Sequence, residues 1–152
     1  MSEVGLLIII PAYNENATIS DVIREARKYG DVTVFDDASS DETREKAAQI
    51  GAMVVSNDTN LGYEKTIGLG FKTAIGNPKY SYLVTLDGDG EHNPGDIPRY
   101  LEKLVSGTHL VCGRSRAKNR FSEEFWGRVG SIFYGIHDPL CGFKDSLLEL
   151  IR

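Results

Sequence analysis

Cysteines, prolines and long apolar runs are all scarce in this chain, and each scarcity excludes a class of protein. Two cysteines among 152 residues cannot form a disulfide framework or a four-cysteine zinc site. Five prolines and no Gly-X-Y period exclude collagen-like and other fibrous architectures. The longest apolar run, residues 6–10, is far below the ~20 residues that span a bilayer, so we expect no membrane-crossing segment.

The charge and the amino-terminal residues exclude two further classes. Seventeen basic against 22 acidic residues give a net charge of −5, which argues against non-specific nucleic-acid binding. Residues 1–3 are acidic at the point where a signal peptide would be basic. We expect Cys112 and Cys141 to be reduced, and therefore a cytoplasmic location. The length, with 41% hydrophobic residues, predicts one domain over residues 1–152.

Apolar patterns along the chain predict strands that alternate with helices. The expected strands are residues 6–10, 32–35, 52–55, 82–86 and 109–112. The expected helices begin near residues 16–18, 39, 64 and 97, with Thr18 and Ser39 each placed to open a capping box. This order predicts an α/β fold: a single Rossmann-like domain whose mostly parallel sheet has helices on both faces.

Polar clusters follow three of these strands, at residues 11–16, 36–41 and 87–92. In parallel α/β sheets, ligands bind beyond the carboxyl ends of the strands. The sequence therefore predicts a site where these three loops meet.

Asp87-Gly88-Asp89 is the sharpest of these signals. Two carboxylates directly after a strand can turn toward one point, and the glycine between them allows a ligand to approach the backbone closely. Mg²⁺ and Mn²⁺ prefer such oxygen ligands, and Glu91 and His92 could add to them. The alternative is a solvated acidic turn. An EF-hand loop fits poorly because a strand precedes the motif, and the three histidines form no metal triad.

The acidic pair Asp36-Asp37 is a second candidate. Adjacent like charges are unfavourable without a ligand or a donor to hold them, and helix capping does not require them. A phosphorylated receiver domain also carries an acidic pair, but there the pair follows the first strand.

Three motifs in succession resemble the signatures of family-2 glycosyltransferases, and most of all those of the dolichol-phosphate mannosyltransferase and polyprenyl-phosphate sugar transferase group. They read IPAYNE at 10–15, DDASSDET at 36–43 and LDGDGEHNP at 86–94. Asn60-Leu61-Gly62-Tyr63 is similar to the connecting motif of that group, and the DPLCGFK segment at 138–144 is similar to its late Asp-Pro-x-x-Gly-Phe element. The chain departs from the pattern at Ala38, where the group usually has glycine.

The resemblance implies a GT-A fold, a nucleotide-sugar donor and a divalent Mg²⁺ or Mn²⁺ ion. It implies that Pro11, Ala12, Tyr13 and Glu15 cradle the nucleoside, that Asp37 with Asp36 contacts the base, and that Asp87, Gly88 and Asp89 meet the ribose, the diphosphate and the metal. Asp87, Asp89 and Glu91 would be the metal ligands.

A basic stretch after the fifth strand would serve the phosphates of donor and acceptor. Arg114 is assigned to the donor, and Arg116 and Arg128 to catalysis beside Asp89 and Asp138. Whether Arg114 or Arg116 matches the arginine of the family is open, and a solvated basic loop is the alternative.

The resulting hypothesis is an inverting, metal-dependent hexosyl transferase that acts on a polyprenyl phosphate or a related membrane acceptor. GDP-mannose and UDP-glucose are the expected donors. The basic and aromatic side chains of residues 114–134 would meet the cytoplasmic membrane face or a second subunit. Because relatives extend beyond Asp138-Pro139, the alternative is a shortened nucleotide-sugar-binding module that needs a partner chain for transfer.

Overall fold

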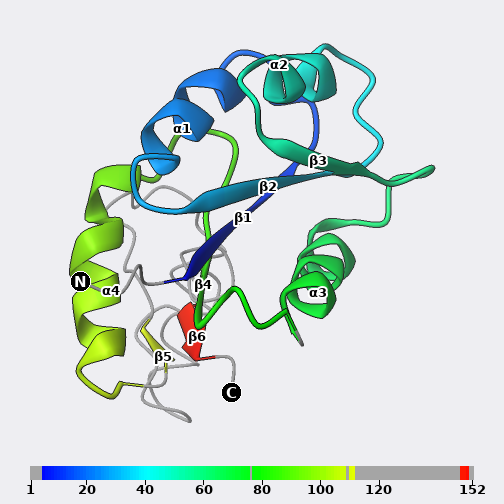
Figure 1. Cartoon of the computed structure of the whole chain (residues 1–152). Helices are drawn as coiled ribbons and strands as arrows, with labels where there is room; N and C mark the ends of the chain where they lie inside the picture. Colours follow the sequence, from blue (N-terminus) through cyan, green and yellow to red (C-terminus); the bar gives the residue numbers. More distant parts are fainter. Residues whose placement is uncertain (1–4, 76, 109, 112–147, 151–152) are drawn as a thin grey trace, which may run out of the picture.

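The structure is a computed structural model that describes residues 5–75, 77–108, 110–111 and 148–150 (Figure 1). Strands and helices alternate along the chain. The elements are β1 Leu6–Ala12, α1 Ile19–Ala26, β2 Asp31–Asp36, α2 Thr43–Gln49, β3 Met53–Ser56, α3 Tyr63–Ala74, β4 Tyr82–Thr85, the 3-10 helix η1 Pro94–Asp96, α4 Ile97–Val105, β5 Leu110–Val111 and β6 Leu148–Leu150.

The strands form one sheet in the order β3-β2-β1-β4-β6-β5. β1 pairs in parallel with both β2 and β4, and β2 pairs in parallel with β3. β6 lies antiparallel between β4 and β5. The prediction of an α/β fold with a mostly parallel sheet is therefore confirmed, whereas β6 was not anticipated.

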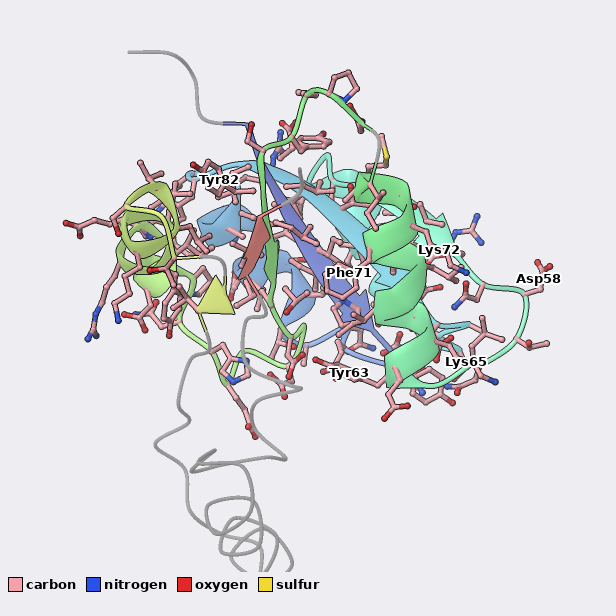
Figure 2. The ribbon with its side chains drawn as sticks, turned by 90° about the horizontal axis from the view of Figure 1, so that it is seen from below. Asp58, Tyr63, Lys65, Phe71, Lys72 and Tyr82 are labelled. Atoms are coloured by element: carbon pink, nitrogen blue, oxygen red, sulfur yellow. The ribbon has the colours of Figure 1, made fainter. Side chains whose placement is uncertain are left out.

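Helices cover both faces of this sheet, as predicted. On one face, α1, α2 and α4 bury a core around Ile8, Ile10 and Val34 (Figure 1). On the other, α3 packs over Ile9 and Phe35, with Phe71 on the sheet side of the helix and Lys65 and Lys72 on the outer side (Figure 2). Successive residues of β1 alternate between these two cores because side chains of a strand point to opposite faces.

β1 continues two residues beyond the predicted strand, through Pro11 and Ala12. The Ala12 carbonyl accepts a hydrogen bond from Asp37 of the β2 side, and the Ile9 carbonyl accepts one from Leu86 of the β4 side. The backbone groups of alternate β1 residues thus bond to opposite neighbouring strands, and the backbone of Pro11 faces β4. Its missing N–H costs no ladder bond because the pairing of β1 with β4 ends at Ile9 and Thr85.

Both predicted capping boxes are wrong. The side chain of Thr18 makes no capping bond to α1, and its hydroxyl instead reaches Gly88. α2 begins at Thr43 rather than near Ser39, and the N–H of Thr43 is satisfied by the Asp41 carboxylate at 2.9 Å. The Thr18 hydroxyl thus bonds across the fold, and at α2 the Asp41 carboxylate takes the place expected of Ser39.

Candidate functional site

A cavity of about 280 Å³ opens where the carboxyl ends of β1, β2 and β4 meet the amino-terminal end of α3. This is the sheet edge that the polar clusters predict. Its lining residues are Pro11, Ala12, Tyr13, Glu15, Asp37, Asn60, Gly62, Tyr63, Thr66, Asp87, Gly88 and Asp89. Eight of these are among the predicted site residues, and the fold gathers them from three separate loops.

The loops after β1 and β2 are hydrogen-bonded into one wall of the cavity. The backbone N–H of Asn14 donates to Ser39 Oγ at 2.9 Å, and the Asn14 side-chain oxygen accepts from the N–H of Ser40, also at 2.9 Å. The N–H of Glu15 donates to Thr43 Oγ1 at 2.8 Å. Tyr13 is 49% exposed, and these hydrogen bonds hold the backbone of the two residues that follow it.

Two residues in this wall have a left-handed backbone without being glycine. Asn14 has φ 58° and Ala38 has φ 61°. Asparagine tolerates this region well, but alanine does so at a cost of about 1–2 kcal/mol. The departure noted at Ala38 therefore leaves a strained turn directly after the acidic pair.

Asp37 joins β2 to the loop that leads into α3. Asp37 is 4% exposed, and its carboxylate accepts hydrogen bonds from Asn57 Nδ2 at 2.7 Å and from the backbone N–H groups of Leu61 and Gly62, each at 2.8 Å. Burial acts to raise the pKa of Asp37, but these bonds outweigh it and hold the pKa below the usual range. Asp37 thus positions the wall formed by Asn60 and Gly62.

Asp36 occupies a different environment from its neighbour. It is 2% exposed and does not line the cavity. One of its oxygens accepts a hydrogen bond from the N–H of Ser39 at 3.3 Å. The acidic pair is therefore divided, with only Asp37 facing the cavity.

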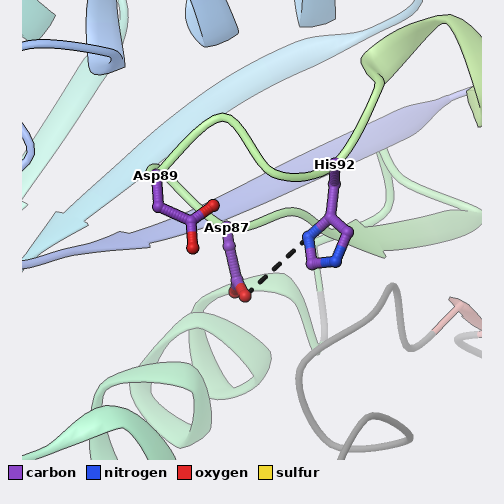
Figure 3. Close-up of side chains that lie close together, drawn as sticks. All are labelled: Asp87, Asp89 and His92. Atoms are coloured by element: carbon purple, nitrogen blue, oxygen red, sulfur yellow. Dashed lines mark ion pairs between the residues drawn. The ribbon is translucent and has the colours of Figure 1, made fainter. Parts of the chain in front are cut away.

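The turn of Asp87, Gly88 and Asp89 forms the opposite wall. Asp87 Oδ1 accepts a hydrogen bond from the Tyr63 hydroxyl at 3.0 Å, and Asp87 Oδ2 lies 3.8 Å from His92 Nδ1 (Figure 3). Asp89 Oδ1 accepts from the N–H of Glu91 at 2.9 Å. Both carboxylates are therefore oriented by neighbouring groups.

Asp87, Asp89 and His92 bring their ligand atoms within 4.8 Å of one another (Figure 3). Two carboxylates and one imidazole are side chains that can bind a divalent cation. Glu91 is exposed and does not belong to this group. His92 is thus a further candidate ligand beside Asp87 and Asp89, and the ligand role of Glu91 stays a prediction.

Glu15 adds a further negative group to the cavity. Burial raises its pKa, and the charges of Asp89 and Asp41 raise it further. The carboxylates crowd around one space, which favours a cation or a hydrogen-bond donor there.

Sequence reasoning missed four lining residues as members of the site: Asn60, Gly62, Tyr63 and Thr66. The motif at 60–63 was a usable signal for three of them. Arg114, Arg116, Arg128 and Asp138 lie outside the described residues, as do Cys112 and Cys141. Among the helices that the structure describes, none is long and apolar enough to cross a bilayer.

Solved structures share this fold. The chain superposes with a TM-score of 0.77 on glucosyl-3-phosphoglycerate synthase of Mycobacterium tuberculosis, in a complex with Mn²⁺, UDP-glucose and phosphoglyceric acid, at 21% identity over 96% of this chain and 56% of that one. A likeness at this identity establishes the GT-A fold.

Curated relatives are similar over nearly the whole chain. An undecaprenyl-phosphate mannosyltransferase of Micrococcus luteus is 32% identical over 97% of this chain and 68% of its own length. A dolichol-phosphate mannosyltransferase of Pyrococcus furiosus is 28% identical over 95% of this chain and 47% of its own length. The chain spans about half the length of several such relatives, with shares of 45%, 52% and 47%.

The family model of glycosyl transferase family 2 matches residues 7–146, which include all three of the motifs that carry the resemblance. The relatives named above fall within the polyprenyl-phosphate group that these motifs resemble most. This chain belongs to glycosyl transferase family 2.

Proposed function

We propose that this chain is the donor-binding domain of a metal-dependent, inverting hexosyl transferase that moves mannose or glucose from a nucleotide-diphosphate sugar to a polyprenyl phosphate or a related membrane acceptor. The observation that carries the proposal is the pair Asp87 and Asp89 at the mouth of the cavity. Similarity to two polyprenyl-phosphate mannosyltransferases supports the acceptor class.

The nucleoside would lie against the wall built from the loops after β1 and β2. Pro11, Ala12 and the ring of Tyr13 offer apolar surface to a base or a ribose, and Glu15 offers an acceptor for hydroxyl donors. Asp37 would help to bind the base, because its carboxylate fixes the backbone of the loop at Leu61 and Gly62 that lines this part of the cavity.

The diphosphate would lie across the turn of Asp87 to Asp89. Asp87 and Asp89, with His92 or Glu91, would hold a bound Mn²⁺ or Mg²⁺, which supplies the positive charge that neutralises the departing nucleoside diphosphate. Gly88 is closely packed, because a Cβ there would lie 3.3 Å from Ile19 Cδ1 and 3.5 Å from Glu15 Cγ. Because Gly88 has no side chain, the turn can lie close to Ile19 and Glu15.

The acceptor requires little activation if it is a phosphate, because a phosphate is already ionised at neutral pH. Direct attack on the face opposite the leaving group inverts the anomeric centre. If the acceptor is a hydroxyl, we assign the general base to Asp138 or Glu91. Arg114 would contact the donor phosphates, and Arg116 and Arg128 the phosphates during transfer.

The protein would act at the cytoplasmic membrane face, reached through residues 114–134 or through a second subunit. The proposal for a membrane contact predicts binding to anionic liposomes that weakens with salt and with the double substitution Arg116→Glu and Arg120→Glu. Sedimentation as a dimer without liposome binding would assign these residues to a subunit interface instead.

The donor site is tested by calorimetric titration of GDP-mannose and UDP-glucose with and without Mn²⁺. We expect binding that depends on Mn²⁺ and is lost in Asp89→Ala, while the matched variant Asp58→Ala, at an exposed aspartate outside the cavity, binds as the wild type does. Full binding and transfer in a folded Asp89→Ala protein would refute the site.

Transfer is tested separately, with membranes as the source of acceptor. Sugar appearing in the lipid fraction supports the transferase. Tight donor binding without transfer to any lipid extract supports the alternative, a binding module that needs a partner chain.

A further inference from the structure

Thr18 connects the first helix to the turn that carries the two carboxylates. Its hydroxyl donates to the Gly88 carbonyl at 2.7 Å and lies 3.4 Å from the Glu15 carbonyl. A hydroxyl has one hydrogen to donate, and the shorter distance assigns it to Gly88. This bond joins residues that are 70 positions apart in the sequence.

Thr18 lies close to the residues on both sides of Asp89. Gly88 precedes Asp89 and holds the bonded carbonyl, so the hydroxyl sets the plane of the peptide that links the two residues. Gly90 follows with φ 79°, and a Cβ at that position would lie 3.5 Å from Thr18 Cγ2. Glycine on each side leaves the Asp89 backbone with wide conformational freedom, which these contacts restrict.

The turn is held from the other side by α3, since the Tyr63 hydroxyl donates to Asp87 Oδ1. Tyr63 lines the cavity, so its loss would mix direct and indirect effects on a ligand. Thr18 does not line the cavity. Any effect of Thr18 on ligand binding is therefore indirect and acts through the residues that it holds in place, Gly88 above all.

We propose that Thr18 is a positioning residue for the carboxylates of Asp87 and Asp89, and that its hydroxyl, by fixing the Gly88 peptide, sets the separation at which these carboxylates hold a divalent cation. The inference rests on the proposed function, which places that cation at the same turn.

The test is the affinity for Mn²⁺ alone, without nucleotide, measured by calorimetry and by the electron paramagnetic resonance signal of free Mn²⁺. Groups that orient metal ligands typically contribute about 10- to 100-fold to affinity, and we expect Thr18→Val to weaken Mn²⁺ binding about tenfold because it acts through the backbone. Thr18→Ser, which restores the hydroxyl, should recover most of the wild-type affinity.

The matched control is Thr73→Val, which removes a hydroxyl bond of 3.0 Å to the carbonyl of Leu69 on the exposed side of α3. We expect wild-type Mn²⁺ affinity in this variant. A structural role alone for Thr18 would lower the melting temperature without changing the affinity of the folded protein for Mn²⁺. If Thr18→Val does not fold, Thr18→Ala replaces it, since Thr18→Ala and Thr18→Ser differ by the hydroxyl alone.

Two results would overturn the inference: an Mn²⁺ affinity for Thr18→Val within about twofold of wild type, or equal affinities for the Val and Ser variants. Asp89→Ala separates this failure from failure of the proposed function. If Asp89→Ala abolishes Mn²⁺ binding while Thr18→Val leaves it intact, the metal site stands and the role of Thr18 is wrong. If Asp89→Ala also binds Mn²⁺ normally, the proposed metal site itself is wrong.

Discussion

Replacing Asp37 by asparagine removes the charge that holds the α3 side of the cavity while preserving the shape of the side chain. Oδ1 of Asp37 accepts hydrogen bonds from Asn57 and Leu61, and Oδ2 accepts one from Gly62. In Asp37→Asn the amide oxygen can retain the first two bonds. The amide NH₂ then faces the N–H of Gly62, and two donors oppose each other.

The cost follows from these contacts. An unpaired buried donor costs about 1–3 kcal/mol, and the remaining bonds lose the extra strength that a charged acceptor provides. We expect Asp37→Asn to lower the free energy of unfolding by about 2–4 kcal/mol. For a protein of this size, that corresponds to a decrease of about 5–15 °C in melting temperature.

The pH dependence has a defined sign. Because the pKa of Asp37 lies below its ordinary value in the folded protein, the unfolded chain binds the proton first as the pH falls. The stabilisation by Asp37 is complete above the unfolded pKa of about 3.9 and is lost as the pH falls through the folded pKa. The difference between wild type and Asp37→Asn should therefore be constant from pH 7 to pH 5 and shrink below pH 4.

Urea unfolding across this pH range measures both quantities. Asp58→Asn is the matched control, since it makes the same substitution at an exposed position of the loop between β3 and α3, and its effect should stay within about 0.5 kcal/mol. A destabilisation by Asp37→Asn no larger than that of the control, or one that persists unchanged to pH 3, would refute the reasoning.

Four further variants test other parts of the structure by thermal and urea unfolding. Gly70→Ala should lower the free energy of unfolding by about 1–2 kcal/mol, because the added Cβ would lie 2.8 Å from Cγ2 of the buried Ile9. Gly68→Ala in the same helix should raise the free energy of unfolding by about 0.5–1 kcal/mol, since nothing lies within 4 Å of its Cβ. Equal effects of the two substitutions would contradict the packing of α3 on β1. Ala38→Gly should stabilise by about 0.5–1 kcal/mol, because relief of the left-handed strain exceeds the entropy that glycine adds to the unfolded chain, and a loss of stability would show that the turn is unstrained. Glu15→Gln should be more stable than wild type at pH 7 in metal-free buffer, because burial and neighbouring carboxylates raise the pKa of Glu15 in the folded protein. The stability of the wild type therefore increases as the pH falls through that pKa, and the difference in stability between the two proteins closes by about pH 4. A wild type more stable than Glu15→Gln at pH 7 would contradict that sign.

Local patterns were sufficient to predict the architecture. The buried run at residues 6–10 and the helical spacing of Ile19, Val22 and Ile23 each follow from a periodicity that is contained in a few consecutive residues. Alternation of such segments predicts a parallel sheet, and with it the edge at which the polar loops meet. The cavity lies at that edge.

Hydroxyl and carboxylate partners could not be predicted in the same way. Thr18 and Ser39 each had a plausible local acceptor or donor in the sequence, but in the folded protein they bond to residues 70 and 25 positions away. A hydroxyl bonds to whichever partner the fold brings within 3 Å, and sequence spacing carries no information about that distance.

The same limit applies to the candidate metal ligands and to β6. Both Glu91 and His92 follow the turn, and only the folded structure shows that His92 lies within reach of Asp87 and Asp89. β6 has only three residues, too few for a periodic signal, and only pairing with β4 and β5 makes it a strand. Apart from β6, the sequence by itself determined the order of the strands and main helices and the edge that holds the site, because both depend on local hydrophobic spacing. Only the tertiary structure decided which polar atoms meet there, because those meetings depend on loops that converge from distant parts of the chain.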